Sequence, residues 1–257
     1  MINSMRVVIA GISLLLVSIH ATASSPLVEL VKTVKPSVVG IGLLTPLESN
    51  ATQLRGTGFV FGNGRYVATN YHVVSEPLDP TIVQHYVVMV GQGKRPQVIK
   101  GEVIALDPVH DVAILEVRNA LVPLSLADDN LVDEGTHIAF TGFPIGAVLG
   151  LYPATHQGIV SAITPDALPS SNSDQLTINM LSRLEKPFLI YQLDATAYPG
   201  NSGSPVFDVS TSRVIAIINK VFVAAGKESA LSTPTGISYA IPIQHLKALA
   251  KKHNIPL

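Results

Sequence analysis

The stretch GTGFVFGNGRYVATNYHVV, residues 56–74, decides the fold. Its apolar runs, 57–61 and 65–70, are short and rich in Val, Phe, Tyr and Thr, which favours strands over helices. Asn63 and Gly64 lie between these runs and are typical of a tight hairpin turn. The stretch therefore predicts an antiparallel hairpin, and the rest of the chain repeats this pattern.

Ten further β-branched runs predict ten more strands in two sets. The first set also contains 38–44, 85–91, 97–106 and 112–117, and the second contains 137–142, 157–163, 188–193, 204–208, 213–223 and 237–241. The polar, turn-rich segment 123–135 predicts a connection between them. Many short strands separated by turn signals indicate sandwiches or barrels. We therefore expect an all-β protein of two β units, at about 36–122 and 136–241.

A predicted helix lies at each end of the β-rich region. The first begins at Ser25 as N-cap with Pro26 at the first helical position, and its apolar face holds Leu27, Leu30, Val31 and Val34. The second covers 242–253, where Ile243, Leu246 and Ala250 share one face. That face is expected to pack on the second β unit.

The composition excludes several classes of site. The chain has 257 residues, 47% hydrophobic, with a formal net charge of −1. This charge offers no electrostatic case for binding nucleic acid or an anionic membrane. The absence of cysteine rules out disulfides, thiolate nucleophiles and zinc–thiolate sites.

The N-terminus predicts a secretory signal peptide over residues 1–23. Arg6 precedes the apolar run 7–19, and Ala21-Thr22-Ala23 offers a small-residue cleavage site. The run is shorter than the roughly 20 residues that a membrane-spanning helix needs. We expect an exported protein, periplasmic or secreted, without a stable membrane span after cleavage. An uncleaved N-terminal anchor is the alternative.

In the segment YPGNSGSPVF, residues 198–207, one serine, Ser202, lies between two glycines, with a proline further out on each side. Glycine permits backbone angles closed to other residues, and proline stiffens the chain. The segment is therefore either an ordinary surface turn or a preset loop that holds one hydroxyl in place. A serine nucleophile needs a base to take its proton.

His72, at the end of an apolar strand, is the candidate base, because the pKa of histidine lies near neutral pH. Asp111 precedes another apolar strand and is the candidate carboxylate that would orient the imidazole. Taken alone, each of these two residues is more typical of a structural role than of a catalytic one. Their combination with Ser202 is what favours a catalytic site.

The motifs TNYHVV, HDVAILEV and GNSGSP, in this order, resemble those of trypsin-like serine proteases. The wider match is to the HtrA/Deg type, since GFPIG, HQGIVSAI, QLDATAYPGNSGSPVF and GISYAIPI also resemble that family. The resemblance runs from about 27 to 249. It implies two six-stranded antiparallel β-barrels with the catalytic triad in the cleft between them.

The resemblance also implies the roles of individual residues. His72 is the general base, Asp111 its orienting partner and Ser202 the nucleophile. Backbone N–H groups of Gly200 and Ser202 form the oxyanion hole. The reaction needs no cofactor and no metal.

Specificity follows from the same likeness. Thr196 matches the floor of the specificity pocket, and because it is not acidic, cleavage after Lys or Arg is not expected. A small or medium apolar side chain before the cut is favoured instead. The strand at about Ile217 to Val221, which includes Ile218 and Asn219, is expected to pair with the substrate backbone.

The sequence departs from the family in two places. Ser204 replaces a glycine and is the form seen in glutamyl endopeptidases, but VIAIINKVF lacks the histidine of their specificity pocket. The chain ends directly after the last helix, where HtrA-type proteins continue into a PDZ domain, which puts peptide-triggered regulation and large assemblies in doubt. Segment 164–187 matches an activation-sensitive loop or is a plain surface insertion.

The sequence therefore predicts an exported serine endopeptidase that hydrolyses unfolded polypeptides, with oligomerisation possible. The alternatives are a non-catalytic peptide-binding or chaperone module on a protease scaffold, and a glutamyl-endopeptidase-like protease. An α/β-hydrolase is disfavoured, because that fold requires the serine before the histidine. A metalloprotease is disfavoured because no HExxH motif occurs.

Overall fold

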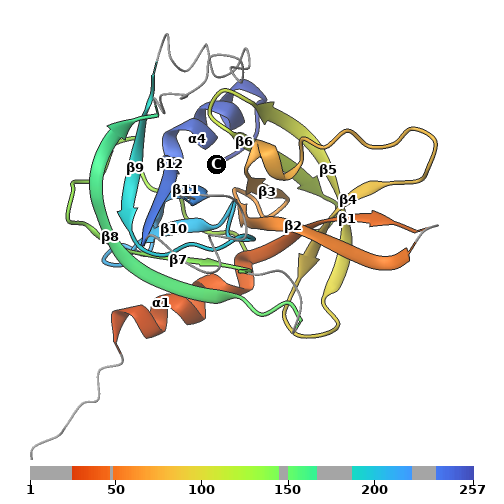
Figure 1. Cartoon of the computed structure of the whole chain (residues 1–257), viewed down its shortest axis with the longest axis horizontal. Helices are drawn as coiled ribbons and strands as arrows, with labels where there is room; N and C mark the ends of the chain where they lie inside the picture. Colours follow the sequence, from red (N-terminus) through yellow and green to blue (C-terminus); the bar gives the residue numbers. More distant parts are fainter. Residues whose placement is uncertain (1–24, 47–48, 145–149, 167–186, 222–235) are drawn as a thin grey trace, which may run out of the picture.

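The computed structural model describes residues 25–46, 49–144, 150–166, 187–221 and 236–257. Two closed antiparallel barrels of six strands lie side by side (Figure 1). The first, in the strand order β1-β2-β3-β6-β5-β4, consists of β1 Val38–Thr45, β2 Ser49–Phe61, β3 Tyr66–Thr69, β4 His85–Val90, β5 Gln97–Asp107 and β6 Val112–Val117. The second, in the order β10-β11-β12-β9-β8-β7, consists of β7 His137–Gly142, β8 Ala154–Pro165, β9 Leu189–Asp194, β10 Pro205–Asp208, β11 Val214–Val221 and β12 Ile237–Pro242.

The predicted all-β architecture of two six-stranded barrels is confirmed, and each predicted strand overlaps an observed one. Two strands, β2 and β8, begin earlier than predicted. The β1–β2 ladder continues beyond a bulge to the pair Thr45 and Ser49, and the β7–β8 ladder begins at Gly142 and Ala154. The residues of both extensions lack a strong alternation of apolar and polar side chains, so the sequence did not predict them as strand. The last two residues of predicted strand 213–223 lie outside the described residues.

The hairpin between β2 and β3 turns over residues 62–65, where it was predicted. Gly62 and Gly64 both have positive φ, 62° and 88°. A Cβ on Gly64 would lie 2.3 Å from the carbonyl oxygen of Leu121, so glycine is needed there for space as well as conformation. The Asn63 side chain accepts a hydrogen bond from the backbone N–H of Arg65 at 3.1 Å.

The C-terminal helix α4, Ile243–Lys252, closes the core between the barrels. It contacts β5 and β6 of the first barrel as well as β11 and β12 of the second. The prediction that it packs on the second unit is therefore confirmed, and the helix packs on the first barrel as well. Its apolar face of Ile243, Leu246, Leu249 and Ala250 is wide enough to reach both barrels.

The N-terminal helix α1, Pro26–Val34, begins where predicted and buries Leu30 and Val34. It runs into the short 3₁₀ turn η1, Lys35–Ser37, which leads into β1. The connection 123–135 forms single β-bridges to both barrels, Leu124 with Phe61 and Leu126 with Val214. This connection is therefore part of the interface between the barrels.

Among the residues described, no helix combines the length and the apolar character required to cross a membrane.

Candidate active site

His72 lies in a short 3₁₀ turn, η2, Tyr71–Val73, immediately after β3. Asp111 lies in the turn that leads into β6, the strand hydrogen-bonded to β3. Pairing of β3 with β6 thus brings residues 39 positions apart to the same end of the first barrel. Asp111 has φ 54°, a left-handed conformation that aspartate adopts more readily than most residues.

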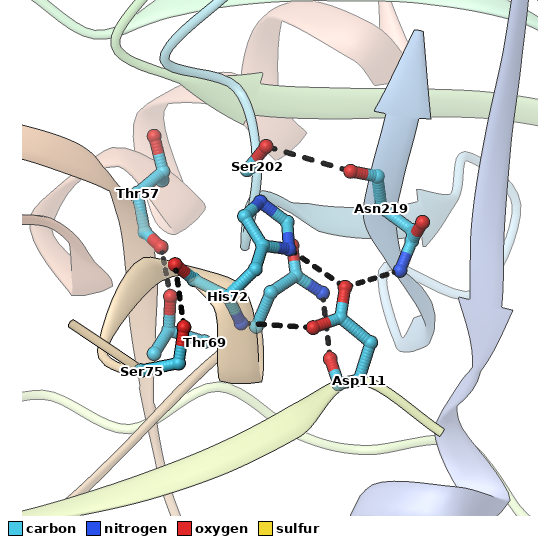
Figure 2. A network of polar contacts seen from close by, with 8 residues as sticks. Thr57, Thr69, His72, Ser75, Asp111, Ser202 and Asn219 are labelled. Carbon is cyan, nitrogen blue, oxygen red and sulfur yellow. Dashed lines mark hydrogen bonds and ion pairs between the residues drawn. The ribbon is translucent and has the colours of Figure 1, made fainter. Parts of the chain in front are cut away.

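Asp111 holds His72 through two separate hydrogen bonds (Figure 2). Its Oδ2 lies 2.7 Å from His72 Nδ1, and its Oδ1 accepts the backbone N–H of His72 at 2.9 Å. The Asp111 side chain is 7% exposed, whereas that of His72 is 46% exposed. The carboxylate is therefore shielded from water while the imidazole remains accessible.

Two asparagines complete the surroundings of Asp111. Asn70, fully buried, donates its amide to the Asp111 carbonyl oxygen at 3.0 Å and so fixes the turn. Asn219, on β11 of the second barrel, donates its amide to Asp111 Oδ2. This last bond joins the two barrels at the carboxylate itself.

Ser202 lies in the loop before β10, and the residues before it form a β-turn. The N–H of Asn201 donates to the carbonyl of Tyr198 at 2.9 Å, Pro199 is second in the turn, and Gly200 is third with φ 99°. Proline second and a positive φ third are the features of a type II turn. Because the central peptide of a type II turn is reversed relative to type I, the φ of Gly200 decides which way its N–H points.

Thr57 on β2 ties this loop to the first barrel. Its N–H donates to the carbonyl of Ser202 at 2.8 Å, and its hydroxyl donates to the carbonyl of Gly200 at 2.7 Å. The same hydroxyl accepts the N–H of Phe143 at 3.0 Å. Packing is so close that a Cβ on Gly203 would lie 2.0 Å from the Thr57 carbonyl oxygen.

The Ser202 hydroxyl donates to the carbonyl of Asn219, at a long 3.4 Å. Figure 2 shows the imidazole of His72 between the Asp111 carboxylate and Ser202. No hydrogen bond between Ser202 and His72 is present among the described residues. In unliganded enzymes such bonds are often long and tighten only when substrate binds. His72, Asp111 and Ser202 are thus brought together, with the last contact unmade.

The four residues predicted to bind substrate fall in different places. Ile217 and Ile218 are buried in the second barrel, and the Ile218 N–H and C=O are bonded to Ser204 and Gly203 in the β10–β11 ladder. Neither residue offers a free backbone edge, so their inclusion is corrected. From Asn219 onward β11 pairs with β12 but has no other strand beside it in the described part of the chain. The open edge is 219–221.

Thr196, the fourth of these residues, is half-buried between two buried alanines. The buried Ser238 on β12 clamps this segment, since its hydroxyl accepts the N–H of Ala197 at 3.0 Å and donates to the carbonyl of Ala195 at 2.7 Å. Thr196 is therefore held on a fixed backbone close to the serine loop.

The interior behind the serine loop holds polar atoms without partners. The side-chain nitrogen and oxygen of Asn201 and the hydroxyl of Ser204 are buried and make no hydrogen bond within the described structure. Ser204 occupies space that Gly142 leaves open, because a Cβ on Gly142 would lie 2.0 Å from Ser204 Oγ. The departure at Ser204 is thus accommodated by a glycine on β7.

His110, next to Asp111, is only partly exposed and packs against α4. Its Nδ1 lies 2.6 Å from Asp107 Oδ2, and its ring stacks on His245 of α4 at 4.1 Å between centroids. Burial, reinforced by the charge of His110, lowers the pKa of His245 to about 4. Burial alone would raise the pKa of Asp107, but hydrogen bonds, chiefly from His110, outweigh it and lower that pKa.

A metal site does not emerge from the part of the chain that is described: no three His, Asp or Glu side chains there are grouped to hold an ion. The predicted loop 164–187 falls mostly on residues 167–186, outside the described residues. Sequence reasoning missed Thr57 and Asn70. Their signal was a polar residue within an apolar strand or at its end, in GTGFVF and YVATNYH.

A family model for the trypsin-like peptidase domain matches residues 56–217. A probable periplasmic serine endoprotease, DegP-like, from Brucella suis is 31% identical over 191 residues, which cover 73% of this chain and 30% of that protein. Protease Do-like 5, chloroplastic, from Arabidopsis thaliana is 28% identical over 226 residues, covering 86% of this chain and 64% of that protein. The chain thus spans about a third of the length of the first of these relatives.

Solved structures share the fold. The active form of the Rv3671c protease from M. tuberculosis has a TM-score of 0.65 at 21% identity, covering 98% of this chain and 96% of its own. Deg5 has a TM-score of 0.60 at 24% identity, covering 87% and 91%. The matched domain contains the positions of His72, Asp111 and Ser202, and it ends at Ile217, within β11 of the second barrel. With its two barrels and its DegP-like relatives, the chain belongs to the trypsin-like peptidase family, HtrA/Deg type.

Proposed function

We propose that this protein is a serine endopeptidase that cleaves polypeptides through a covalent acyl-enzyme. The observation that carries the proposal is the pairing of His72 with Asp111, in which a shielded carboxylate binds both the ring and the backbone of an accessible histidine. A histidine that only stabilised the fold would not need an exposed ring nitrogen facing a glycine-framed serine.

The pairing supports one tautomer of His72. An ionised carboxylate only accepts hydrogen bonds, so the Nδ1 facing Asp111 Oδ2 carries the proton. The Nε2 of the neutral ring then has a free lone pair and serves as the base. Asp111 stabilises the imidazolium once the ring has taken a second proton.

The reaction follows from these positions. Ser202 Oγ turns from the Asn219 carbonyl to His72 Nε2, gives up its proton and bonds to the substrate carbonyl carbon. The oxyanion is stabilised by the N–H groups of Gly200 and Ser202. His72 then protonates the leaving amine as the peptide C–N bond breaks. Water, deprotonated by His72, hydrolyses the acyl-enzyme and regenerates Ser202.

Substrate binding is proposed at the open edge 219–221, where an extended peptide adds as a further strand. Thr196 favours a small or medium apolar side chain before the cut. The relatives named periplasmic, together with the basic and apolar N-terminus, support export with cleavage after Ala23. Unfolded proteins are the proposed substrate class, because strand addition requires an extended backbone.

The test is labelling of the purified protein with a fluorophosphonate, alongside Ser202→Ala and with unfolded casein present or absent. We expect wild-type labelling, its loss in Ser202→Ala, and casein cleavage by wild type alone. Folding of both proteins is checked by circular dichroism. The mass of the protein recovered from the periplasm or medium tests the cleavage site.

Labelling that requires casein would indicate a resting state in which Ser202 stays on the Asn219 carbonyl until substrate arrives. Folded wild-type protein that labels under neither condition would contradict the proposal. The non-catalytic peptide-binding alternative would then be tested by casein binding without cleavage.

A further inference from the structure

A ring stack in the second barrel leads from the barrel wall to the turn that carries Gly200. His156 on β8 lies directly opposite Phe140 on β7 in the strand register. The two rings are stacked, with centroids 4.9 Å apart and planes 20° from parallel. A second ring, that of Tyr198, also lies beside His156, with ring centroids 5.9 Å apart and planes tilted by 48°.

Tyr198 is the first residue of the type II turn that ends at Asn201. Its carbonyl accepts the hydrogen bond that closes the turn, at 2.9 Å. Pro199 beside it is exposed and Gly200 has no side chain, so neither anchors the turn by packing. The Tyr198 ring is therefore, beside the buried Asn201 and the hydroxyl of Thr57, a side-chain contact through which the direction of the Gly200 N–H can be fixed.

The surroundings of His156 suit a neutral ring. Its Nε2 is buried and has no hydrogen-bond partner within the described structure. Burial lowers the pKa of His156, and no charged group contributes to that shift among the described residues. The titratable group in contact with it, from the serine loop, is the Tyr198 phenol, and its contact on β7 is the apolar Phe140.

We propose that His156 is a positioning residue, whose ring, backed by Phe140, supports Tyr198 and keeps the Gly200 N–H aimed into the oxyanion hole. The inference rests on the proposed function and deepens it. His156 exchanges no proton with the substrate. It acts through the turn, so its loss should weaken transition-state stabilisation more than substrate binding.

Protonation of His156 should loosen the same contact. A charge and an N–H without an acceptor would then lie in a buried site, which is unfavourable. The acid limb of the kcat profile should therefore contain two protonations. One of them, below the ordinary histidine pKa, is that of His156, and the other is that of the base.

The test compares His156→Ala, which removes the ring, with His156→Phe, which keeps a flat ring but cannot be protonated. His137→Ala is the matched control, since His137 is an exposed histidine on the adjacent strand β7. Steady-state kinetics use a chromogenic peptide ester that the wild type hydrolyses. We expect His156→Ala to lower kcat about five- to tenfold with KM within twofold of wild type. His156→Phe should recover kcat to within about twofold, and His137→Ala should match wild type.

The pH profile supplies the second readout. In wild type the slope of log kcat against pH should steepen at the acid end, and in His156→Phe it should stay at one proton. Unchanged kcat in His156→Ala, or equal losses in both variants, would overturn the proposal, as would a change confined to KM. If the wild type labels with fluorophosphonate and the kcat of His156→Ala equals that of the wild type, only this inference fails. If folded wild type never labels, the proposed function fails and this inference with it.

Discussion

The two halves of the site are held in different ways. Around Asp111, in the first barrel, both carboxylate oxygens and the backbone carbonyl accept hydrogen bonds, from His72, Asn70 and Asn219. Behind Ser202, in the second barrel, the side chains of Asn201 and Ser204 are buried without partners in the described structure. His72 is thus fixed by side-chain hydrogen bonds, whereas Ser202 depends on backbone conformation and on hydrogen bonds from Thr57.

Because of this difference, substitutions in the two halves are expected to impair the site in different ways. Disturbing the Asp111 half removes hydrogen bonds that define a protonation state. Disturbing the Ser202 half changes the direction of a peptide group or the position of a hydroxyl. Three substitutions test this comparison, from the largest expected effect to the smallest, and a fourth probes a residue outside both halves.

Asp111→Asn should have the largest effect, lowering kcat by about 10⁴-fold. An amide at this position can present an N–H to His72 Nδ1, which selects the tautomer with the proton on Nε2 and removes the base. Asp107→Asn is the matched control, because Asp107 also binds a histidine Nδ1, at 2.6 Å, on the same loop. Steady-state kinetics on a peptide ester should show less than about a threefold change in the control. Comparable losses in both variants would mean that the loop as a whole, and not the tautomer, sets the rate.

Gly200→Ala should lower kcat by about 10²–10³-fold, the usual effect of losing one oxyanion donor. A side chain disfavours φ 99° and shifts the turn away from type II. Gly135→Ala provides the control, since Gly135 has φ 88° and a Cβ there would meet nothing within 4 Å. Thermal melting should show similar destabilisation of both variants, with kcat lost only in Gly200→Ala. Equal activity in the two would contradict the role given to Gly200.

Thr57→Val should lower kcat by about tenfold and the free energy of unfolding by about 1–3 kcal/mol. Valine keeps the shape but removes the hydroxyl that donates to the Gly200 carbonyl and accepts the Phe143 N–H. The loss is partial, because the backbone bond from Thr57 to Ser202 remains. Thr57→Ser retains the hydroxyl and should stay near wild type in urea unfolding and in kcat. A serine variant as impaired as the valine variant would point to packing of the methyl group instead.

The smallest effect is expected outside both halves, at His245. Its folded-state pKa of about 4 lies below the ordinary 6.5, so the unfolded state binds the extra proton between these values. Stability should therefore fall as the pH is lowered from about 6.5 towards 4, with Tm dropping by about 2–4 °C for each kcal/mol lost. His245→Phe keeps the ring against His110 and Phe188 and should flatten this dependence. The charged groups facing His245 are His110 and Asp107. If the Tm of the wild type and the Tm of His245→Phe change equally across this pH range, the assignment is refuted.

The fold and the candidate triad could be predicted because their signals are local. Short β-branched runs, Asn63-Gly64 and the residues around His72, Asp111 and Ser202 are each readable within about ten positions. The bond from Asn219 to Asp111 joins residues 108 positions apart, and that from Thr57 to Gly200 joins residues 143 apart. Neither bond leaves a pattern in a single sequence.

The misplaced substrate edge has a similar cause. Ile217 and Ile218 read as part of one apolar strand with Asn219. Only the register with β10 shows where one side of that strand becomes free. The face of α4 was predicted from its period, but which barrels it touches depends on closure of both. Register and closure are tertiary properties that the spacing of apolar residues does not encode.

The helix α4 has a consequence for how the molecule comes into being. Its apolar face completes a core to which Phe59 and Ile114 contribute from one barrel and Ile217 and Ile241 from the other. Because chains are made from the N-terminus, α4 emerges from the ribosome after all twelve strands. Until it docks, apolar side chains of both barrels remain open to water, and the two halves of the site lack the packing that joins them. Packing of α4 against both barrels is thereby delayed until synthesis has passed Lys252, so a nascent, unfinished chain lacks one of the contacts that hold Ser202 near His72.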